Sequence, residues 1–540
     1  MSKESTEKCR KCQAIILLEK LVVNNHICPN CGCYLQFPAM NRLKALADDG
    51  SFEEWKAAIA YTPPFEDAKY RSQLREAQKK YNMKDAIIIG KMKINNRAVA
   101  VGVMDTRFLM ASLGYLVGEK VTLLFEIATK KKLPVIIFCC SGGARMQEGM
   151  ISLMQMEKIA AAVVRHSLAG LLYISVLTNP TMGGVSASYA MLADIVLAEE
   201  GAMIGFAGAR VIEQNIGIKF SKEFQTAKFQ KEHGFIDAIV SRNDIKKHFA
   251  AILELHKRKY RYDKRLKKIV QQKTASYNIS RTVWERIQLA RAMNRPTSMQ
   301  YINLLFDIFI EFCGDRVMGD DHSIVAGLAM FHGLPVTVIA QQKGKDSIEQ
   351  AKYYNWGMPS PSGYRKALRL MKQAEKFNRP VICFIDTIGA ACGKEAEEQG
   401  QSVVIANLLR EMSILMVPIL SIIISEGNSG GALALGVGNE VWMLENAVYS
   451  VISPEGYASI MWKDNSRAAE ASDRMKMGAD ALFENGIIDK IIVEEEPVTT
   501  DNMQKICKEL DIEIQAFIKK YSHKTKKAII QERYLRFRKF

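Results

Sequence analysis

The chain has 540 residues, of which 48% are hydrophobic and 24% are charged, a composition typical of a soluble globular protein. Two large domains are expected from this length, and no uninterrupted apolar stretch reaches the roughly 20 residues that would span a bilayer. The first residues lack an apolar signal core, which favours a cytoplasmic protein. The net charge of +16 is best explained by solvated helix faces and a linker, and attraction to polyanions is the alternative.

Residues 1–40 carry two close pairs of cysteines with the spacing C-x2-C-x15-C-x2-C, namely Cys9, Cys12, Cys28 and Cys31. Two such pairs on two tight turns can place four thiolates tetrahedrally around zinc. Disulfide bonds are the alternative, and a cytoplasmic location disfavours them. We predict a zinc ribbon with a structural metal ion, with Cys33 and His26 as possible substitute ligands.

Residues 41–245 are predicted to form a first α/β domain. A short helical connector is expected at 41–60, ended by Pro63 and Pro64. Four short apolar stretches then predict buried strands, and the sequence after the fourth stretch predicts a helix. The expected strands are Ile87–Ile89, Ala98–Val103, Pro134–Phe138 and Gly170–Leu177, and the expected helix is Val185–Leu192.

Gly183 and Gly184 lie between the last predicted strand and that helix. Without a Cβ, the two residues let a ligand approach the backbone closely. The unpaired N–H groups at a helix start attract negative charge, so this turn could stabilise an oxyanion. The preceding loop, Ser141–Gly149, contains Arg145 and Glu148, which could be catalytic or could pair to hold the loop; we favour the pairing.

Residues 246–283 are predicted to be a basic helical linker, because Lys246–Lys273 contains eleven Lys or Arg and little glycine or proline. A second domain is expected at 284–540. There Arg365, Lys366 and Arg369 form a compact cationic group that could meet an acidic partner or a carboxylate, or could be ordinary surface charge on a helix.

The second domain repeats the pattern of the first. Gly430 and Gly431 follow the apolar stretch Val417–Ser425, and each glycine pair lies 49 or 50 residues after a similar Pro-Val-Ile stretch. Downstream, Gly234–Val240 is echoed by Gly486–Ile492. So long a period indicates domain duplication rather than a solenoid array. The duplication therefore predicts two oxyanion sites, one in each domain.

Several common catalytic signatures are missing. The sequence has no G-x-x-x-x-G-K-[ST] loop, no G-x-S-x-G elbow and no H-E-x-x-H motif, and none of its eight histidines lies in a recognisable triad setting. Chemistry is therefore expected to depend on backbone N–H groups more than on a side-chain nucleophile.

These motifs support a resemblance to the carboxyltransferase of bacterial acetyl-CoA carboxylase. The N-terminal half resembles its β subunit through the cysteine motif, Ser141–Gly149, Pro180–Ser188 and Gly205–Val211. The C-terminal half resembles its α subunit through Arg295-Pro296, Gly314–Arg316, Tyr364–Met371, Ile385–Thr387, Glu426-Gly427, Ser429–Ala432 and Ile452–Glu455. The chain looks like a natural fusion of the two.

The resemblance implies an α/β fold with two duplicated ClpP/crotonase-like domains after the zinc ribbon. It implies transfer of a carboxyl group from carboxybiotin to acetyl-CoA, giving malonyl-CoA for fatty acid biosynthesis, with biotin itself able to take the methyl proton. Gly183 and Gly184 would hold the thioester enolate, and Gly430 and Gly431 the ureido oxygen of biotin. Implied cofactor contacts lie at Gly142, Gly143, Ala144, Arg145, Gly205, Phe206, Ala207, Gly208 and Arg365.

The implied partners are a biotin carboxyl carrier protein and biotin carboxylase, which complete an ATP-dependent complex. A homodimer, equivalent to an α2β2 heterotetramer, is expected, and no membrane association. Three alternatives remain: carboxyl transfer to propionyl-CoA or another acyl-CoA, a crotonase-like hydratase, and a zinc-ribbon protein that binds nucleic acid. The duplicated glycine turns favour the carboxyltransferase.

Overall fold

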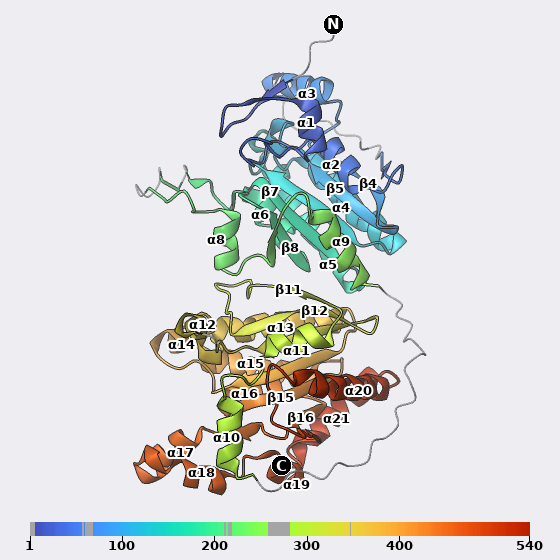
Figure 1. The fold of residues 1–540 in the computed structure, drawn as a ribbon. Coiled ribbons are helices and arrows are strands. Elements are labelled where there is room, and N and C mark those ends of the chain that lie inside the picture. Colours follow the sequence, from blue (N-terminus) through green and yellow to red (C-terminus); the bar gives the residue numbers. More distant parts are fainter. Residues whose placement is uncertain are drawn as a thin grey trace. The chain divides into compact units, whose positions relative to one another are not determined.

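A computed structural model of the chain describes residues 6–56, 59, 68–209, 212–213, 219–257, 281–345 and 347–540. These residues separate into two compact units (Figure 1). The first comprises residues 1–232 and 236–256, and the second comprises residues 233–235 and 257–540.

The domain boundaries deduced from the sequence stay predictions. Helix α9 (Ile245–Glu254) crosses the predicted start of the linker and belongs to the first unit. Residues 258–280, the greater part of the predicted linker, lie outside the described residues. Helix α10 (Val283–Arg291) follows and begins with a capping box formed by Thr282 and Glu285.

The chain starts with a small ribbon. Strands β1 (Thr6–Lys8) and β2 (Ile15–Leu17) pair antiparallel, and helix α1 (Leu18–Val23) follows. Among the described residues, the apolar centre of the ribbon consists of Ile16, Leu21, Leu35 and buried cysteines, with Ala14 and Leu18 packed against it. So small a core cannot stabilise a fold alone, which is the usual reason for a structural metal.

The first unit is built on an eight-stranded sheet of order β10-β8-β7-β6-β5-β4-β3, with β9 paired to β7. The strands from β5 to β10 run parallel, and the β-branched sequence Val135-Ile136-Ile137 is typical of such buried strands. The strands are β3 (Glu53–Glu54), β4 (Ile87–Ile94), β5 (Arg97–Met104), β6 (Val135–Ser141), β7 (Tyr173–Met182), β8 (Ile195–Glu199), β9 (Ile204–Gly205) and β10 (Ala238–Val240).

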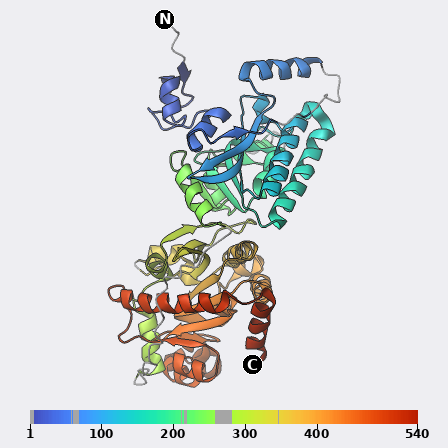
Figure 2. The same cartoon turned by 90° about the vertical axis from the view of Figure 1, so that its right-hand side faces the viewer.

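Two long neighbouring helices, α4 and α5, pack beside this sheet (Figure 2). Their buried residues recur at helical spacing, as in Val117, Val121 and Leu124 of α4. The helices of the first unit not yet given are α2 (Ala39–Leu46), α3 (Ala68–Tyr81), η1 (Leu109–Ala111), α4 (Tyr115–Lys131), η2 (Met146–Glu148), α5 (Gly149–Leu168), α6 (Gly183–Ser186), η3 (Tyr189–Met191) and α8 (Ala227–Glu232).

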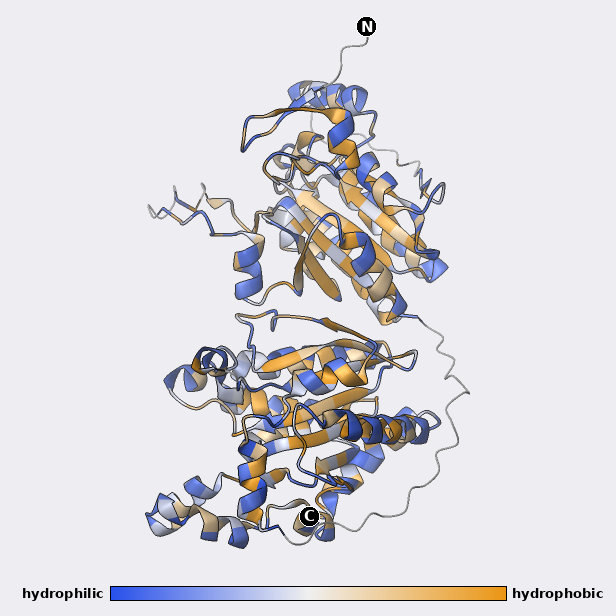
Figure 3. Ribbon diagram, in the orientation of Figure 1, coloured by the Kyte–Doolittle hydropathy of each residue, from blue (hydrophilic) through white to orange (hydrophobic). Residues whose placement is uncertain are grey.

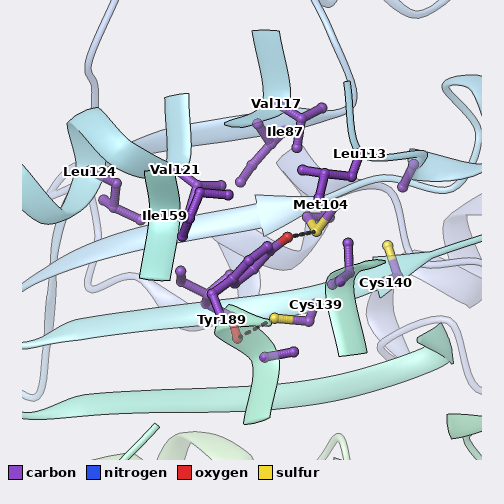
Figure 4. Packing of buried hydrophobic residues seen from close by; sticks show 14 of the residues in the cluster. Ile87, Met104, Leu113, Val117, Val121, Leu124, Cys139, Cys140, Ile159 and Tyr189 are labelled. Atoms are coloured by element: carbon purple, nitrogen blue, oxygen red, sulfur yellow. Dashed lines mark hydrogen bonds between the residues drawn. The ribbon is translucent and has the colours of Figure 1, made fainter. Parts of the chain in front are cut away.

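Tyr189 fixes the segment that follows α6 in the core. Figure 4 shows its ring lying among buried residues, with its hydroxyl 3.1 Å from the sulfur of Met104. The carbonyl of Tyr189 accepts a hydrogen bond from the Tyr173 hydroxyl at 3.0 Å. The segment that follows α6 is therefore anchored in the core through both the ring and the backbone of Tyr189.

The second unit repeats the topology, with strand order β11-β12-β13-β14-β15-β16-β18 and β17 paired to β15. The strands from β13 to β18 run parallel, and both sheets are hydrophobic along most of their strands (Figure 3). The strands are β11 (Ile308–Glu311), β12 (Ile324–Phe331), β13 (Leu334–Gln341), β14 (Val381–Thr387), β15 (Ile419–Asn428), β16 (Glu440–Leu444), β17 (Val448–Ser450) and β18 (Lys490–Ile492).

The predicted echo of Gly234–Val240 in Gly486–Ile492 is confirmed, because β10 and β18 occupy the same edge of the two sheets. The helices after α10 are α11 (Ser298–Leu305), α12 (Ile348–Tyr353), η4 (Asn355–Gly357), α13 (Pro361–Lys376), α14 (Lys394–Glu398), α15 (Gln401–Ile414), α16 (Ser429–Gly436), α17 (Pro454–Trp462), η5 (Asn465–Arg467), α18 (Ala468–Met475), α19 (Ala479–Glu484), α20 (Met503–Tyr521) and α21 (Lys526–Arg538).

Two sequence predictions of local structure are wrong in part. In the described part of the connector at 41–60, the helix ends at Leu46, and Glu53–Glu54 then pairs with β4 as the edge strand β3. The helix predicted at Val185–Leu192 is one turn, α6, followed by the separate 3-10 turn η3. The buried Tyr189 explains the second error, because its position is set by the core rather than by a helical period.

Candidate active site

In the first unit, the candidate site lies where the neighbouring parallel strands β6 and β7 end. The φ angle of Gly183 is +61°, a value that glycine adopts without strain. A Cβ on Gly183 would lie 2.8 Å from the Cα of Gly143, which belongs to the loop after β6. The glycine thus allows the two loops to touch.

The backbone N–H groups of this turn are of two kinds, those that donate a hydrogen bond within the protein and those that do not. The N–H of Gly183 donates to the carbonyl of Phe206 at 2.9 Å, so this N–H is occupied. The N–H of Gly143 donates to the Ser141 hydroxyl at 3.0 Å. Throughout the described residues, no acceptor lies within hydrogen-bonding distance of the N–H groups of Ala144 and Gly184. These two groups are the available donors.

The second unit builds the same arrangement from β14 and β15. The N–H of Gly389 donates to the Thr387 hydroxyl at 3.0 Å, as that of Gly143 does to Ser141. The N–H groups of Ala390 and Gly430 have no acceptor among the residues that the structure describes. Sequence reasoning missed Ala390, which lies three residues after the Ile385–Thr387 motif.

The two glycine pairs occupy positions that differ by one residue. Strand pairing matches Ser141 with Thr181 in one sheet and Thr387 with Gly427 in the other. Counting from these pairs, Gly183 corresponds to Ser429, whose φ is +60°, and Gly184 corresponds to Gly430. The unequal spacings of 49 and 50 residues in the sequence were the signal of this offset.

The glycine that comes closest to the neighbouring loop also differs between the two units. A Cβ on Gly431 would lie 2.3 Å from the backbone nitrogen of Ala390, whereas a Cβ on Gly430 would meet nothing within 4 Å. The carbonyl of Gly431 accepts hydrogen bonds from the Gln341 amide at 2.9 Å and the Tyr364 hydroxyl at 3.1 Å. Gly431 is therefore a packing position, and Gly430 carries the available N–H.

A buried ionic cluster adjoins the second site. The Lys343 ammonium lies 2.7 Å from Asp386 and 2.7 Å from Glu426, and Arg291 approaches Glu426 at 2.9 Å. Burial alone would raise the pKa of Glu426, but the attraction of Lys343 and Arg291 outweighs it and lowers the pKa to about 2. The sequence motifs contained Asp386 and Glu426 but did not indicate that these carboxylates meet Lys343 and Arg291.

In the first unit, Arg145 is buried and wholly engaged. Its guanidinium makes two 2.7 Å contacts with the Asp85 carboxylate and a longer one of 3.4 Å with Glu148. The predicted pairing with Glu148 is present, but Asp85 is the main partner. Glu148 in turn accepts hydrogen bonds from the Tyr70 hydroxyl and the Tyr115 N–H, both at 2.5 Å.

The other residues predicted to contact cofactors surround the first site. The N–H of Gly142 donates to the Met110 carbonyl at 2.8 Å. Gly205 pairs with Met182 in the sheet, and the Phe206 side chain is 73% exposed. The Ala207 carbonyl accepts from Gln225 at 2.7 Å, and Gly208 has open space at its Cβ position. Residues 210 and 211 of this motif lie outside the described residues.

The cationic group on α13 is largely committed to internal contacts. Arg365 bonds Asp315 at 2.7 Å, and Arg369 bonds the carbonyl of Gly314 at 2.9 Å. Lys366 is fully buried and lies 2.6 Å from Asp320. The interpretation of these residues as ordinary surface charge is therefore wrong for Lys366.

The four predicted cysteine ligands come together in the ribbon. All four sulfur atoms lie within 4.8 Å of one another, so the group could hold a metal ion. Cys9 lies 3.6 Å from Cys31, and Cys12 lies 3.7 Å from Cys28; none is in a disulfide. These distances suit thiolates that share one ion.

A second buried cluster fixes the ribbon to the first sheet. Glu199, at the end of β8, is fully buried between Arg42 at 2.5 Å and Arg242 at 3.0 Å. The same Arg242 donates to the carbonyls of His26 and Leu35, each at 3.0 Å. The Arg242 guanidinium therefore bonds both to the ribbon and to Glu199 of the sheet.

None of the described helices combines the length and the apolar character needed to cross a membrane.

Two protein families match this chain. The family described as "Carboxyl transferase domain" matches residues 36–244, and the family described as "Acetyl co-enzyme A carboxylase carboxyltransferase-like" matches residues 231–540.

Solved carboxyltransferase structures share the fold. A transcarboxylase 12S structure, with methylmalonyl-coenzyme A and methylmalonic acid bound, has a TM-score of 0.70 at 20% identity and covers 91% of this chain and 90% of its own. A single-chain, multi-domain long-chain acyl-CoA carboxylase has a TM-score of 0.67 at 19% identity and covers 91% of this chain and 47% of its own. These similarities confirm the two-sheet carboxyltransferase fold.

Curated relatives carry a more specific name. The "acetyl-coenzyme A carboxylase carboxyl transferase subunits beta/alpha" of Natranaerobius thermophilus is 48% identical over 98% of this chain and 90% of its own length. That of Clostridium tetani is 49% identical over 92% and 86%. The separate α subunit of Clostridium acetobutylicum is 54% identical over 48% of this chain and 93% of its own length. The chain belongs to the acetyl-CoA carboxylase carboxyltransferase family and joins its β and α parts in one polypeptide.

Proposed function

We propose that this carboxyltransferase moves the carboxyl group from carboxybiotin, presented by a carrier protein, to acetyl-CoA and so forms malonyl-CoA. The observation that carries the proposal is the duplicated pair of available N–H groups, Ala144 with Gly184 and Ala390 with Gly430. The reaction develops negative charge on two different oxygens, so two such sites suit it.

The two sites take different oxygens in this proposal. Ala144 and Gly184 hold the thioester oxygen of the acetyl-CoA enolate, and Ala390 and Gly430 hold the ureido oxygen of biotin. Gly183 and Gly431 give the turns their shape. The loop at Gly142 and the segment around Phe206, which adjoin the first site, are the proposed contacts for coenzyme A. Arg145, through its ion pair with Asp85, holds the loop at Gly142 in place.

The proposed chemistry balances without a side-chain base. The N–CO2 bond of carboxybiotin breaks, and the electron pair stays on the ureido group. The ureido group takes a proton from the acetyl methyl, and the resulting enolate carbon attacks the released CO2 to form the new C–C bond. The protein holds the two reactants close together and stabilises both anions, and these two effects account for most of the rate enhancement.

We further propose that the metal held by the four cysteines is zinc, because four thiolates at these distances suit tetrahedral coordination. When bound, zinc supplies folding free energy to the ribbon rather than chemistry at the active site. The proposed partners are the biotin carboxyl carrier protein and biotin carboxylase, in the cytoplasm, and the proposed assembly is a homodimer.

The deciding experiment is an acyl-CoA panel. The purified chain is supplied with carboxybiotinylated carrier and with acetyl-, propionyl- or butyryl-CoA, and the carboxylated products are quantified. We expect malonyl-CoA as the main product and propionyl-CoA as a poorer substrate. Preference for propionyl-CoA would reassign the substrate, and no turnover together with salt-sensitive RNA binding would overturn the proposal.

Metal analysis of Cys28→Ser tests the zinc assignment. We expect one zinc per chain in the parent protein and loss of stoichiometric zinc in the variant, because one of four thiolates is removed. Retention of the metal in the variant would assign Cys33 or His26 as a ligand instead.

A further inference from the structure

The buried amine of Lys343 bridges the two strands that lead into the second site. Lys343 follows β13, and its ammonium contacts Asp386 on β14 and Glu426 on β15, each at 2.7 Å. The exposed fractions of the three residues are 8%, 0% and 2%. A buried charge is stable only when paired, so this ammonium and both carboxylates depend on one another.

The bridge lies where the ladder between the two strands is irregular. Ile385 pairs with Ile423, but the next registered pair is Thr387 with Gly427, so Asp386 and Glu426 fall inside a bulge. Bulges change the direction in which a strand continues. The residues that follow this bulge directly are the loop to Ala390 and the turn to Gly430.

The first unit closes the equivalent bulge in a different way. There the hydroxyls of Thr178 and Thr181 donate to the Cys139 carbonyl at 2.9 and 2.8 Å. In the positions of Asp386 and Glu426, the first unit has Cys140 and Pro180, which carry no charge. The ionic bridge is therefore an addition at the second site rather than a requirement of the fold.

We propose that Lys343 is a positioning residue for carboxyl transfer. By tying Asp386 to Glu426 across the bulge, it sets the separation and direction of the Ala390 and Gly430 N–H groups. The inference rests on the proposed role of those N–H groups in holding the ureido oxygen. Loss of the Lys343 side chain should therefore slow the biotin-dependent step and leave the binding of acyl-CoA unchanged.

Removal of Lys343 alone would leave two buried carboxylates with one fewer cation, so the test variant is the charge-balanced pair Lys343→Met/Asp386→Asn. Glu426 then keeps Arg291 as its partner. The reaction measured is decarboxylation of malonyl-CoA in the presence of free biotin, with kcat, KM for biotin, Kd for malonyl-CoA and Tm determined separately.

We expect kcat to fall at least about tenfold, which is less than the roughly 100- to 1,000-fold loss on removing an oxyanion donor outright, because the donors stay present but are misplaced; Kd for malonyl-CoA should be unchanged. Lys343→Arg, which keeps a cation able to reach both carboxylates, should restore most of kcat. The matched control is Arg533→Met. Arg533 is buried near the start of β15, where it donates to the Val417 carbonyl, so its loss should lower Tm but not kcat.

The outcomes separate the two proposals. A parent protein without transfer activity overturns the proposed function and this inference with it. An active parent with a fully active double variant, or a loss that Arg533→Met reproduces, overturns only the inference. If the double variant does not fold, Glu426→Gln decides: it neutralises the carboxylate at nearly constant volume and so removes its ionic contacts with Lys343 and Arg291, and full kcat in that variant overturns the role of Lys343.

Discussion

The two units share a strand order and a pair of available N–H groups, yet they support these groups differently. In the first unit a buried guanidinium, Arg145, holds the loop that carries Ala144. In the second unit the residue equivalent to Arg145 is Ala391, and the buried cation at the strand ends is Lys343, which pairs with Asp386 and Glu426. The comparison shows that backbone topology creates the site, while the nearby charges are specific to each copy.

The required glycine differs as well. The first unit needs glycine at Gly183, where φ is positive and Gly143 is close, and the second has Ser429 there. The second unit needs glycine at Gly431, and the first has Val185 at that position. A repeated sequence motif can therefore conceal different packing requirements.

Arg145→Ala should give the largest effect, a loss of about 3–5 kcal/mol in the free energy of unfolding of the first unit. The Asp85 carboxylate is fully buried and would lose its ionic partner. Chemical denaturation followed by a probe in the first unit measures the loss. Arg145→Ala/Asp85→Asn is the control and should recover part of it; an unchanged midpoint in the single variant would contradict the assignment.

Glu426→Gln should remove a pH-dependent part of the stability of the second unit. Its pKa is lowered to about 2 from an ordinary value of 4.5, so its stabilisation is complete above pH 4.5 and is lost as pH falls towards 2. At about 1.4 kcal/mol per pKa unit this amounts to about 3 kcal/mol. Acid unfolding curves should be flatter for the variant in this range, and parallel curves would contradict the prediction.

Gly431→Ala should lower kcat by about 100-fold, because the new Cβ would fall 2.3 Å from the Ala390 nitrogen and displace one donor of the second site. Gly319→Ala is the control. Its Cβ would meet only the Ser362 side chain, at 3.5 Å, an ordinary contact, so kcat should stay within about threefold of the parent, a difference below 1 kcal/mol. Equal losses in both variants would assign the effect of Gly431→Ala to a general disturbance of the second unit rather than to the clash at Ala390.

Gly183→Ala should lower kcat/KM for malonyl-CoA by about 30-fold, a somewhat smaller effect because the clash with the Gly143 Cα is at 2.8 Å. The change also forces alanine to a φ of +61°. Gly201→Ala is the control, because it also forces alanine to a positive φ, +69°, but its Cβ would meet nothing within 4 Å. An equal loss of kcat/KM in both variants would assign the effect to backbone strain in general rather than to the clash with Gly143.

Much of the architecture could be predicted because it depends on patterns that are local in the chain. Apolar strands such as Val135–Ser141 and the cysteine spacing need no knowledge of distant residues. The family resemblance extended this to fold and function, and the comparisons confirm both. The assignment of individual site residues stays a proposal.

The remainder could not be predicted because it depends on contacts far apart in sequence. Asp85 reaches Arg145 from 60 positions away, and Lys343 meets Glu426 across 83. The offset between Gly183 and Ser429 arises from strand register, which an apparent repeat of two glycines hides. Only the one-residue difference in spacing indicated it.

The shared guanidinium of Arg242 has a practical consequence for anyone who shortens this protein. A fragment that begins after the ribbon would contain Glu199 and Arg242 but not the carbonyls of His26 and Leu35 that Arg242 serves. In that fragment the Arg242 guanidinium, which is buried in the full chain, would lose these hydrogen bonds and become exposed to water. The cysteine segment is therefore better treated as an integral part of the first unit than as a separable domain.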